Sequence, residues 1–318
     1  MKRIFVSFIA VVTMLSVCLC ACERENGGDG PEGEEGLIGG FNGAGVSNAV
    51  FSVGPGKRVR FSKGNLRYNA AFNAWKLADN QYDYVGKDNN NIAPDYNGWI
   101  DLFGWGTSGW ESGAVAYQPW DTITIDSNYW VGGYWGNGLF DGYEQADWGY
   151  HNIIVNGSGL AGFWRTLKIG EWRYLLDSNE VRKDKWGFAK IGNDKYGMVI
   201  LPDAWKLPQG VTFQPSDGTR DNSPLNSYSL DEWGIMESGG AIFLPSASIR
   251  SGAIVSDDFE GNHRGSYWSS SCHYTMTSYD VTFDTWYLNE SDGDLTLRTD
   301  IKRPRHVGCS VRLVRDEK

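Results

Sequence analysis

The segment GSYWSSSCHY at residues 265–274 decides how this chain is interpreted, because it has the pattern of a β-strand and carries Ser271, Cys272 and His273 side by side. Successive side chains of a strand point to opposite faces. Trp268, Ser270, Cys272 and Tyr274 then share one face, and Ser269, Ser271 and His273 share the other. Cys272 and His273 therefore do not meet, and Ser271 lies roughly 6–7 Å from His273 along the strand. The segment predicts a core strand rather than a nucleophile beside its base.

Other strands are predicted at both ends of the body. Residues 50–53 and 58–62 alternate at period two around the turn-forming Gly-Pro-Gly of 54–56. Further strands are expected at 66–68, 74–77, 197–201, 241–244, 267–271, 279–288, 294–298 and 309–315. This order favours an α+β domain whose terminal strands meet in one sheet.

Two short helices are predicted between these groups of strands. The first covers 167–176, with Thr166 as a possible cap and with Leu167, Trp172, Leu175 and Leu176 facing inward. The second covers 228–236, with Ser229 as a possible N-cap and Glu232 three residues later. Residues 95–150 show almost no periodicity but many Trp, Tyr and Gly residues, which predicts an ordered insertion held by aromatic packing.

The amino-terminal end has the pattern of a secreted protein. Lys2 and Arg3 precede an apolar run from Ile4 to Leu19, which indicates a signal peptide over residues 1–21. Leu19-Cys20-Ala21-Cys22 resembles the bacterial lipobox, in which the last cysteine becomes the acylated first residue of the mature chain, so Cys22 is the predicted lipidation site. A cut at another small residue, leaving Cys22 as an ordinary thiol, is the alternative.

Residues 22–36 are acidic and rich in glycine, which predicts a flexible tether. Such a stretch behind the lipidated cysteine resembles the surface-export signal of Bacteroidetes lipoproteins, although a solvated linker would look the same. We therefore expect an outer-membrane, lipid-anchored protein at the cell surface. No other stretch approaches the roughly 20 apolar residues of a spanning helix.

Charge and cysteine content narrow the possible partners of the body at 37–318, which we expect to be a single elaborated domain. Removing Lys2 and Arg3 from the 29 basic residues leaves 27 against 39 acidic residues, a formal charge of −12. This balance argues against binding to nucleic acid or to anionic membranes. The body contains Cys272 and Cys309, which are expected to form one disulfide. The alternatives are two free thiols, or a pair of cysteines with a redox or metal-binding role.

Four motifs resemble a known family: FWRTL at 163–167 with Glu171-Trp172, FLPSASIRSG at 243–252, GSYWSSS at 265–271 and GCSVRLVR at 308–315. Together they are similar to the Fibrobacter succinogenes major paralogous domain, which is related to the formylglycine-generating-enzyme branch of the C-type-lectin-like fold. The similarity covers about 162–315, and 51–150 looks like the amino-terminal half of Bacteroides lipoproteins of this kind. One departure is Thr-Leu-Lys-Ile at 166–169, where relatives often have Leu-Pro-Thr.

The resemblance implies two kinds of site. Formylglycine-generating enzymes bind copper with two cysteines close in sequence, whereas 36 residues separate Cys272 from Cys309 here, so we expect no enzyme activity. The C-type-lectin resemblance implies a ligand site in the loops at 251–264 and 289–306. The candidate ligand-binding residues there are Trp286, Asp292, Asp294, Arg298, Arg305 and His306.

Two acidic clusters carry the oxygen ligands that Ca²⁺ takes. They are Asp257, Asp258, Glu260 and Asn262, and Asn289, Glu290, Asp292 and Asp294. Neither has the spacing of an EF-hand loop, and solvated turns have the same composition, so we expect no cofactor or metal and keep Ca²⁺ as the alternative.

Three functions compete. The first is a surface lipoprotein that binds an extracellular glycan or protein without catalysis. The second is an enzyme of the formylglycine-generating type or its degenerate descendant. The third is a structural subunit of a pilus-like or envelope assembly, which the aromatic insertion would suit.

Overall fold

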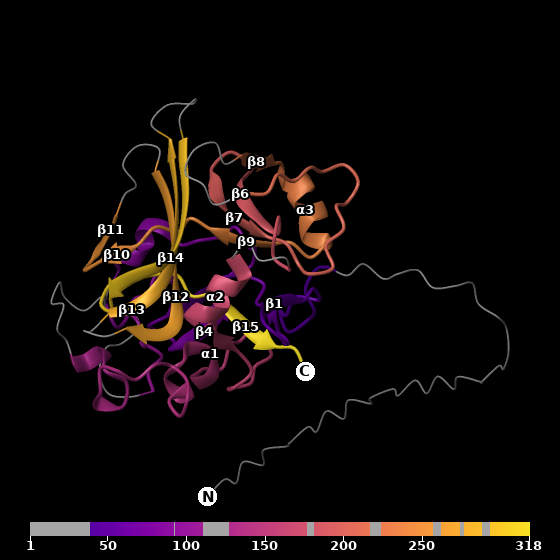
Figure 1. Ribbon diagram of the computed structural model, residues 1–318. Helices are drawn as coiled ribbons and strands as arrows, with labels where there is room; N and C mark the ends of the chain where they lie inside the picture. Colours follow the sequence, from indigo (N-terminus) through magenta and orange to yellow (C-terminus); the bar gives the residue numbers. More distant parts are fainter. Residues whose placement is uncertain are drawn as a thin grey trace, which may run out of the picture. The chain divides into compact units, whose positions relative to one another are not determined.

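The computed structural model describes residues 39–91, 93–110, 127–176, 181–216, 224–256, 262–273, 277–287 and 293–318, without the side chains of Asn262 and 283–296. The predicted signal peptide, Cys22 and the tether lie outside these residues. Leu37–Lys318 forms one compact unit. Within it the described residues combine short helices with mostly antiparallel sheets (Figure 1), which confirms the α+β class.

The elements follow one another as three groups. The first contains β1 (Phe51–Gly54), β2 (Lys57–Phe61), β3 (Leu66–Asn69), β4 (Ala74–Leu77), η1 (Gly86–Asn90), η2 (Ser127–Tyr129), η3 (Val131–Gly133), η4 (Glu144–Ala146) and α1 (Trp148–His151). The second contains β5 (Arg165–Thr166), α2 (Ile169–Leu176), β6 (Trp186–Ile191), β7 (Lys195–Ile200), β8 (Leu225–Tyr228), α3 (Leu230–Ser238) and β9 (Ile242–Pro245). The third contains β10 (Arg250–Ser251), β11 (Ile254–Val255), β12 (Asn262–His273), β13 (Thr277–Tyr287), β14 (Gly293–Pro304) and β15 (Leu313–Asp316).

The two ends of the body meet in one sheet of order β1-β2-β15-β5, as the sequence predicts. The turn between β1 and β2 places Gly56 at a φ of 67°, a conformation that glycine adopts without steric cost. Val314 of β15 then pairs with Phe61 of β2 on one side and with Arg165 of β5 on the other. The last strand therefore joins segments that are about 150–250 positions earlier in the chain.

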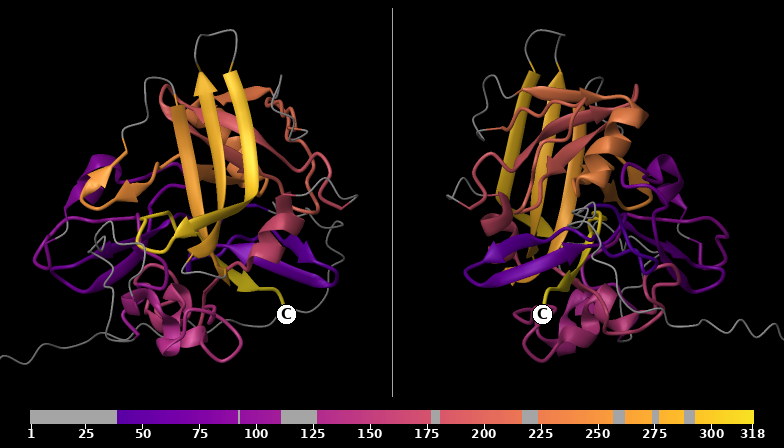
Figure 2. Two further views of the ribbon diagram at one scale, coloured as in Figure 1. Left: turned by 60° about the vertical axis from the view of Figure 1, so that its left-hand side comes forward. Right: turned by 90° about the vertical axis from the view of Figure 1, so that its right-hand side faces the viewer.

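Two further sheets complete the body. β8, β6, β7 and β9 form a four-stranded sheet in which only β6 and β8 run parallel. β12, β13 and β14 form a long antiparallel sheet whose strands stand side by side in Figure 2. β3 pairs with β4, and β10 pairs with β11, as separate two-stranded units.

Both predicted helices are present with shifted ends: α2 begins two residues later than predicted, and α3 covers Leu230–Ser238 instead of 228–236. α3 begins after Ser229, whose side chain accepts from the Glu232 N–H while the Glu232 carboxylate accepts from the Ser229 N–H, so the predicted capping box is confirmed. α2 begins at Ile169 rather than at Leu167. Thr166 belongs to β5 instead of capping the helix, and the Ser271 hydroxyl accepts the Ile169 N–H.

The aromatic insertion packs into the core, as predicted. Trp105 and Trp148 are fully buried in the same apolar cluster as Trp268 of β12. The indole N–H of Trp105 donates to the Ser269 carbonyl at 2.9 Å, and that of Trp268 donates to the Phe103 carbonyl at 2.6 Å. The described part of the insertion therefore contributes to the same core as the carboxy-terminal strands.

Candidate functional site

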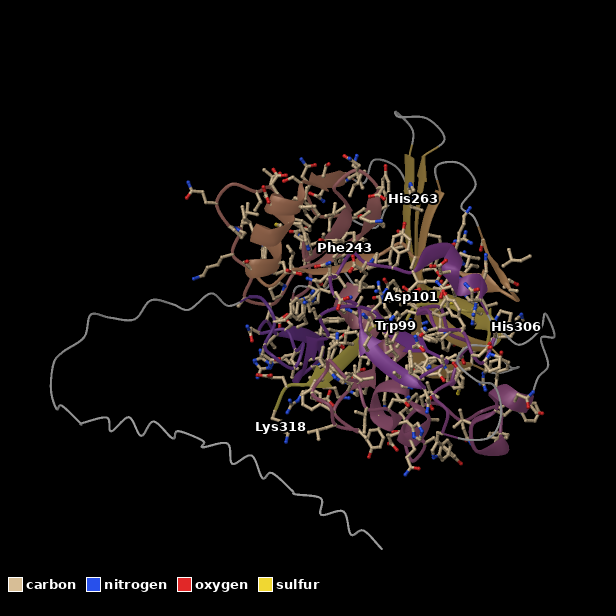
Figure 3. All side chains as sticks on the ribbon, turned by 180° about the vertical axis from the view of Figure 1, so that it is seen from behind. Trp99, Asp101, Phe243, His263, His306 and Lys318 are labelled. Carbon is tan, nitrogen blue, oxygen red and sulfur yellow. The ribbon has the colours of Figure 1, made fainter. Side chains whose placement is uncertain are left out.

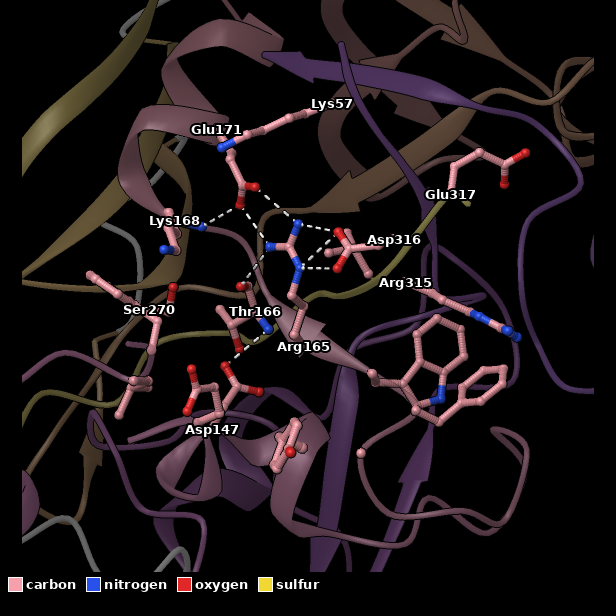
Figure 4. Close-up of a pocket in the computed structure, with 18 of the residues that line it drawn as sticks. Lys57, Asp147, Arg165, Thr166, Lys168, Glu171, Ser270, Arg315, Asp316 and Glu317 are labelled. Carbon is pink, nitrogen blue, oxygen red and sulfur yellow. Dashed lines mark hydrogen bonds and ion pairs between the residues drawn. The ribbon is translucent and has the colours of Figure 1, made fainter. Parts of the chain in front are cut away.

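A cavity of about 560 Å³ lies beside the short strand β5 (Figure 4). β15 and the start of α2 form part of its wall, and residues 139–150 of the aromatic insertion form another part. The cavity therefore depends on the pairing of β15 with β5, which brings the final strand next to the segment that precedes α2.

Arg165 stands in the wall of this cavity and holds two carboxylates. Its guanidinium donates to Glu171 at 2.7 and 2.9 Å, and its Nη2 and Nε donate to Asp316 at 2.5 and 3.0 Å. The remaining N–H donates to the Thr166 carbonyl at 3.3 Å. Burial opposes the charge on Arg165, but its hydrogen bonds to Asp316 and Glu171 and the negative charges of these carboxylates outweigh burial and raise the guanidinium pKa. All five donors of the guanidinium are thus used inside the protein.

Asp147 lies on the other side of Thr166 and is 1 % exposed. One carboxylate oxygen accepts the Gly149 N–H at the start of α1, and the other accepts the Thr166 N–H, both at 2.9 Å. Burial raises the pKa of Asp147 to about 6, against the effect of these bonds and of the Arg165 charge. None of the described residues forms an ion pair with Asp147.

The rim carries aromatic rings and cations. Lys168 lies 4.1 Å from the ring centroid of Phe140 and 3.4 Å from Asp141, while Arg315 lies 4.1 Å from the ring centroid of Phe163. Tyr150 is 43 % exposed. These cations therefore already have neighbours on the protein, and the cavity combines aromatic rings with charged groups.

Ser270 of β12 is the remaining polar group of interest in the cavity wall. It is 1 % exposed, and its hydroxyl is buried without a hydrogen-bond partner among the described residues. A buried hydroxyl of this kind normally has a partner, so it is available to one that enters the cavity.

The residues predicted to bind a ligand are not brought together. Trp286 of β13 and Asp294 of β14 are register partners, and Arg298 is exposed further along β14. Asp292 and the side chains of Trp286 and Asp294 lie outside the described residues. The predicted residues with described side chains, Arg298, Arg305 and His306, do not line the cavity beside β5.

Arg305 and His306, which were predicted in a ligand-binding loop, are both buried in the structure. Arg305 is 2 % exposed, donates to the carbonyls of Tyr129 and Trp135, and stacks 4.3 Å from the ring centroid of Trp105. His306, labelled in Figure 3, is 6 % exposed. Arg305 therefore holds the aromatic insertion.

The predicted disulfide is absent, because Cys272 and Cys309 are both free thiols in the structure. The Cys272 thiol donates to the Gly136 carbonyl at 2.9 Å, and Cys309 is fully buried on a segment that pairs with Phe103. Each cysteine thus packs as a small core residue. Burial raises the pKa of both thiols, which keeps them neutral.

The neighbours of Cys272 have structural contacts as well. The Ser271 hydroxyl accepts a hydrogen bond from the Ile169 N–H at the start of α2, and His273 lies 3.1 Å from the Thr277 hydroxyl.

The described residues contain no group of three or more His, Cys, Asp or Glu side chains that could hold a metal ion. The calcium candidates Asp257, Asp258, Glu260, Asn289, Glu290 and Asp292 lie outside the described residues, as do the side chains of Asn262 and Asp294.

Thiol titration should distinguish the two cysteines. In reduced protein covering residues 37–318, a thiol reagent is expected to modify the half-buried Cys272 slowly and to leave the buried Cys309 unmodified. Unfolding in urea should then make both thiols react with the reagent. Two unreactive thiols in non-reducing denaturant would instead show that the disulfide forms, and fast modification of Cys309 in native protein would contradict its burial.

Two functional features of the cavity were missed by sequence reasoning. Arg165 and Glu171 were noted only as parts of a family-like motif, and nothing in the spacing linked them to Asp316. Asp147 and Ser270 had no signal, since one lies in the aperiodic insertion and the other among three consecutive serines.

The fold and the cavity define an α+β domain with a charged and aromatic surface cavity. No family model matches the chain, and comparisons with curated proteins and with solved structures found no match either. Among the described residues, no helix has both the length and the apolar character to cross a membrane.

Proposed function

We propose that this chain is a lipid-anchored protein of the outer membrane, displayed at the cell surface, whose C-type-lectin-like body binds an extracellular glycan or protein without catalysis. The lipobox ending at Cys22 and the acidic tether support the anchor and the export. The body supports a binding role because it carries a cavity large enough for a residue or a sugar ring.

The observation that carries the proposal is the saturated hydrogen bonding of Arg165 within this cavity. A catalytic group must reach a substrate atom in the state that its chemistry needs. Here all five N–H donors of the Arg165 guanidinium are used in hydrogen bonds to Glu171, Asp316 and Thr166. The cavity wall is therefore held rigid, which suits recognition of a ligand.

The thiols favour binding over the formylglycine-generating alternative. A copper-binding pair of cysteines needs accessible thiolates that approach each other. Cys309 is fully buried, and burial raises the pKa of both thiols. Both properties oppose metal capture by this pair.

Binding assays with the body at 37–318 test the proposal. The protein should bind a defined extracellular glycan or protein saturably on a glycan array or a cell surface. Tyr150→Ala, at the rim of the cavity, should weaken this binding about tenfold if the ring contributes as an interface hot spot. Tyr134→Ala is the matched control, since Tyr134 is 51 % exposed and lies outside the cavity. Absence of saturable binding would contradict the function, and equal affinities of the two variants would contradict the site.

A further inference from the structure

The cavity is lined by six carboxylates and five cations: Asp141, Glu144, Asp147, Glu171, Asp316 and Glu317 against Lys57, Arg58, Arg165, Lys168 and Arg315. Arg165 is the one guanidinium between Glu171 and Asp316, so this group of three has one excess negative charge when ionised. Asp147 adds a carboxyl group with no ion-pair partner among the described residues. The polar groups around Arg165 and Asp147 are thus mainly acceptors: the lone pairs of these carboxylates and the buried Ser270 hydroxyl.

We propose that this cavity binds the ammonium group of a lysine side chain presented by a partner polypeptide, with Asp147 and Ser270 as its acceptors. The inference rests on the proposed function, because it names the ligand of the same cavity. A lysine ammonium has three donors and no acceptor, which matches a wall whose free groups accept. A neutral sugar presents hydroxyls that both donate and accept, and the Arg165 guanidinium has no donor left for them.

The depth at which Asp147 and Ser270 lie in the cavity favours a lysine side chain over an amino sugar as the ligand. Asp147 and Ser270 are each 1 % exposed, so a ligand group must reach deep into the cavity to contact them. A lysine carries its charge at the end of a flexible four-carbon stem, which can pack along apolar surface. Leu139, Phe140 and Trp164 supply such surface in the cavity. An amino group on a sugar ring would have to bring the whole ring to the same depth.

The charged groups around Asp147 are compatible with a bound cation. From β5, Arg165 faces it but is neutralised by Glu171 and Asp316. From η4, Glu144 lines the same cavity and adds negative charge. At the rim, Lys168 contacts Asp141 and Phe140. The formal charge of −12 on the mature chain also attracts a basic partner over longer distances.

Peptide binding to the full-length lipoprotein in detergent tests the inference. The probe is a fluorescent Gly-Gly-Lys-Gly-Gly peptide with blocked termini, followed by anisotropy, together with the same peptide acetylated on its lysine. Acetylation should weaken binding about tenfold or more, because it removes the charge-assisted hydrogen bonds. Ser270→Val, which replaces the hydroxyl by methyl groups, should weaken binding by about the same factor.

The matched control is Ser278→Val on β13. Ser278 is also buried with an unpartnered hydroxyl among the described residues, but it does not line the cavity. The Ser278→Val variant should bind the lysine peptide as tightly as the unmodified protein does. Circular dichroism should show that both serine variants fold. Equal binding of the acetylated peptide, or equal affinities of the two serine variants, would overturn the inference.

A second experiment distinguishes failure of this inference from failure of the proposed function. A glucosamine oligomer is added as competitor, and the same protein is tested for saturable binding to an extracellular ligand. Displacement of the lysine peptide by the oligomer at equal amine concentration would reassign the cavity to amino sugars. Saturable binding of another ligand without any lysine binding would overturn the inference alone, while no binding at all would overturn both.

Discussion

Replacing Trp105 with alanine is expected to lower the free energy of unfolding of the body by about 3–5 kcal/mol, the usual cost of truncating a buried tryptophan. Trp105 is fully buried among side chains of the carboxy-terminal strands. Its indole N–H also donates to Ser269, and its ring stacks on Arg305. The change would therefore leave a cavity, an unpaired carbonyl and a guanidinium without its aromatic neighbour.

Urea unfolding of residues 37–318, followed by circular dichroism, measures this loss. Tyr134→Ala provides the control, because Tyr134 belongs to the same insertion but is 51 % exposed. It should change the stability by no more than about 0.5 kcal/mol. A Trp105 variant as stable as this control would mean that the insertion does not contribute to the core.

Asp147 is expected to make the folded protein less stable as pH rises from 4 to 8. Its ordinary pKa of 3.8 is raised to about 6 by burial. Well below pH 3.8 the carboxyl is protonated in both the folded and unfolded states, so it causes no penalty. Between these two values the unfolded chain has released the proton that the folded chain still holds, and stability falls with rising pH. The shift of about 2 units corresponds to about 3 kcal/mol, fully present above pH 6.

Comparison with Asp147→Asn isolates this effect. The amide cannot ionise, so the difference between the two unfolding free energies should change by about 3 kcal/mol between pH 3 and pH 8. The variant also loses one acceptor for the Gly149 or Thr166 N–H, which gives an offset that does not depend on pH. Asp101 and Asp280 have pKa values that burial also raises, but they are common to both proteins and cancel. Parallel curves would contradict the raised pKa of Asp147.

Local patterns predicted most of the regular structure correctly. The alternation around Gly-Pro-Gly of 54–56 predicted β1 and β2, and Ser229 with Glu232 predicted the capped start of α3. The start of α2 was placed two residues early because Thr166 is a good N-cap residue by type, whereas its N–H is bound by Asp147 within β5. Tertiary contacts decided this boundary against local propensity.

The site was predicted much less well, since its residues are far apart in the sequence. Arg165 and Asp316 meet only because β15 pairs with β5. Arg305 and His306 follow an exposed strand and have the residue types of a binding loop, but the Trp105 ring and two carbonyls of the insertion enclose Arg305. Residue type and spacing along the sequence do not show that segments distant in the sequence will surround a side chain.

By itself, the sequence of this protein determined the alternation of strands, the α+β class, the meeting of the terminal strands and the packing of the aromatic insertion. These features follow from short-range periodicity and from the need to bury many tryptophans. Only the tertiary structure decided the rest: that GSYWSSSCHY contributes Ser271 to the start of α2 and Ser270 to the cavity, and that Asp147 lies there without an ion pair among the described residues. The physical reason is that burial and pairing of polar groups depend on segments distant in sequence, which no local pattern encodes.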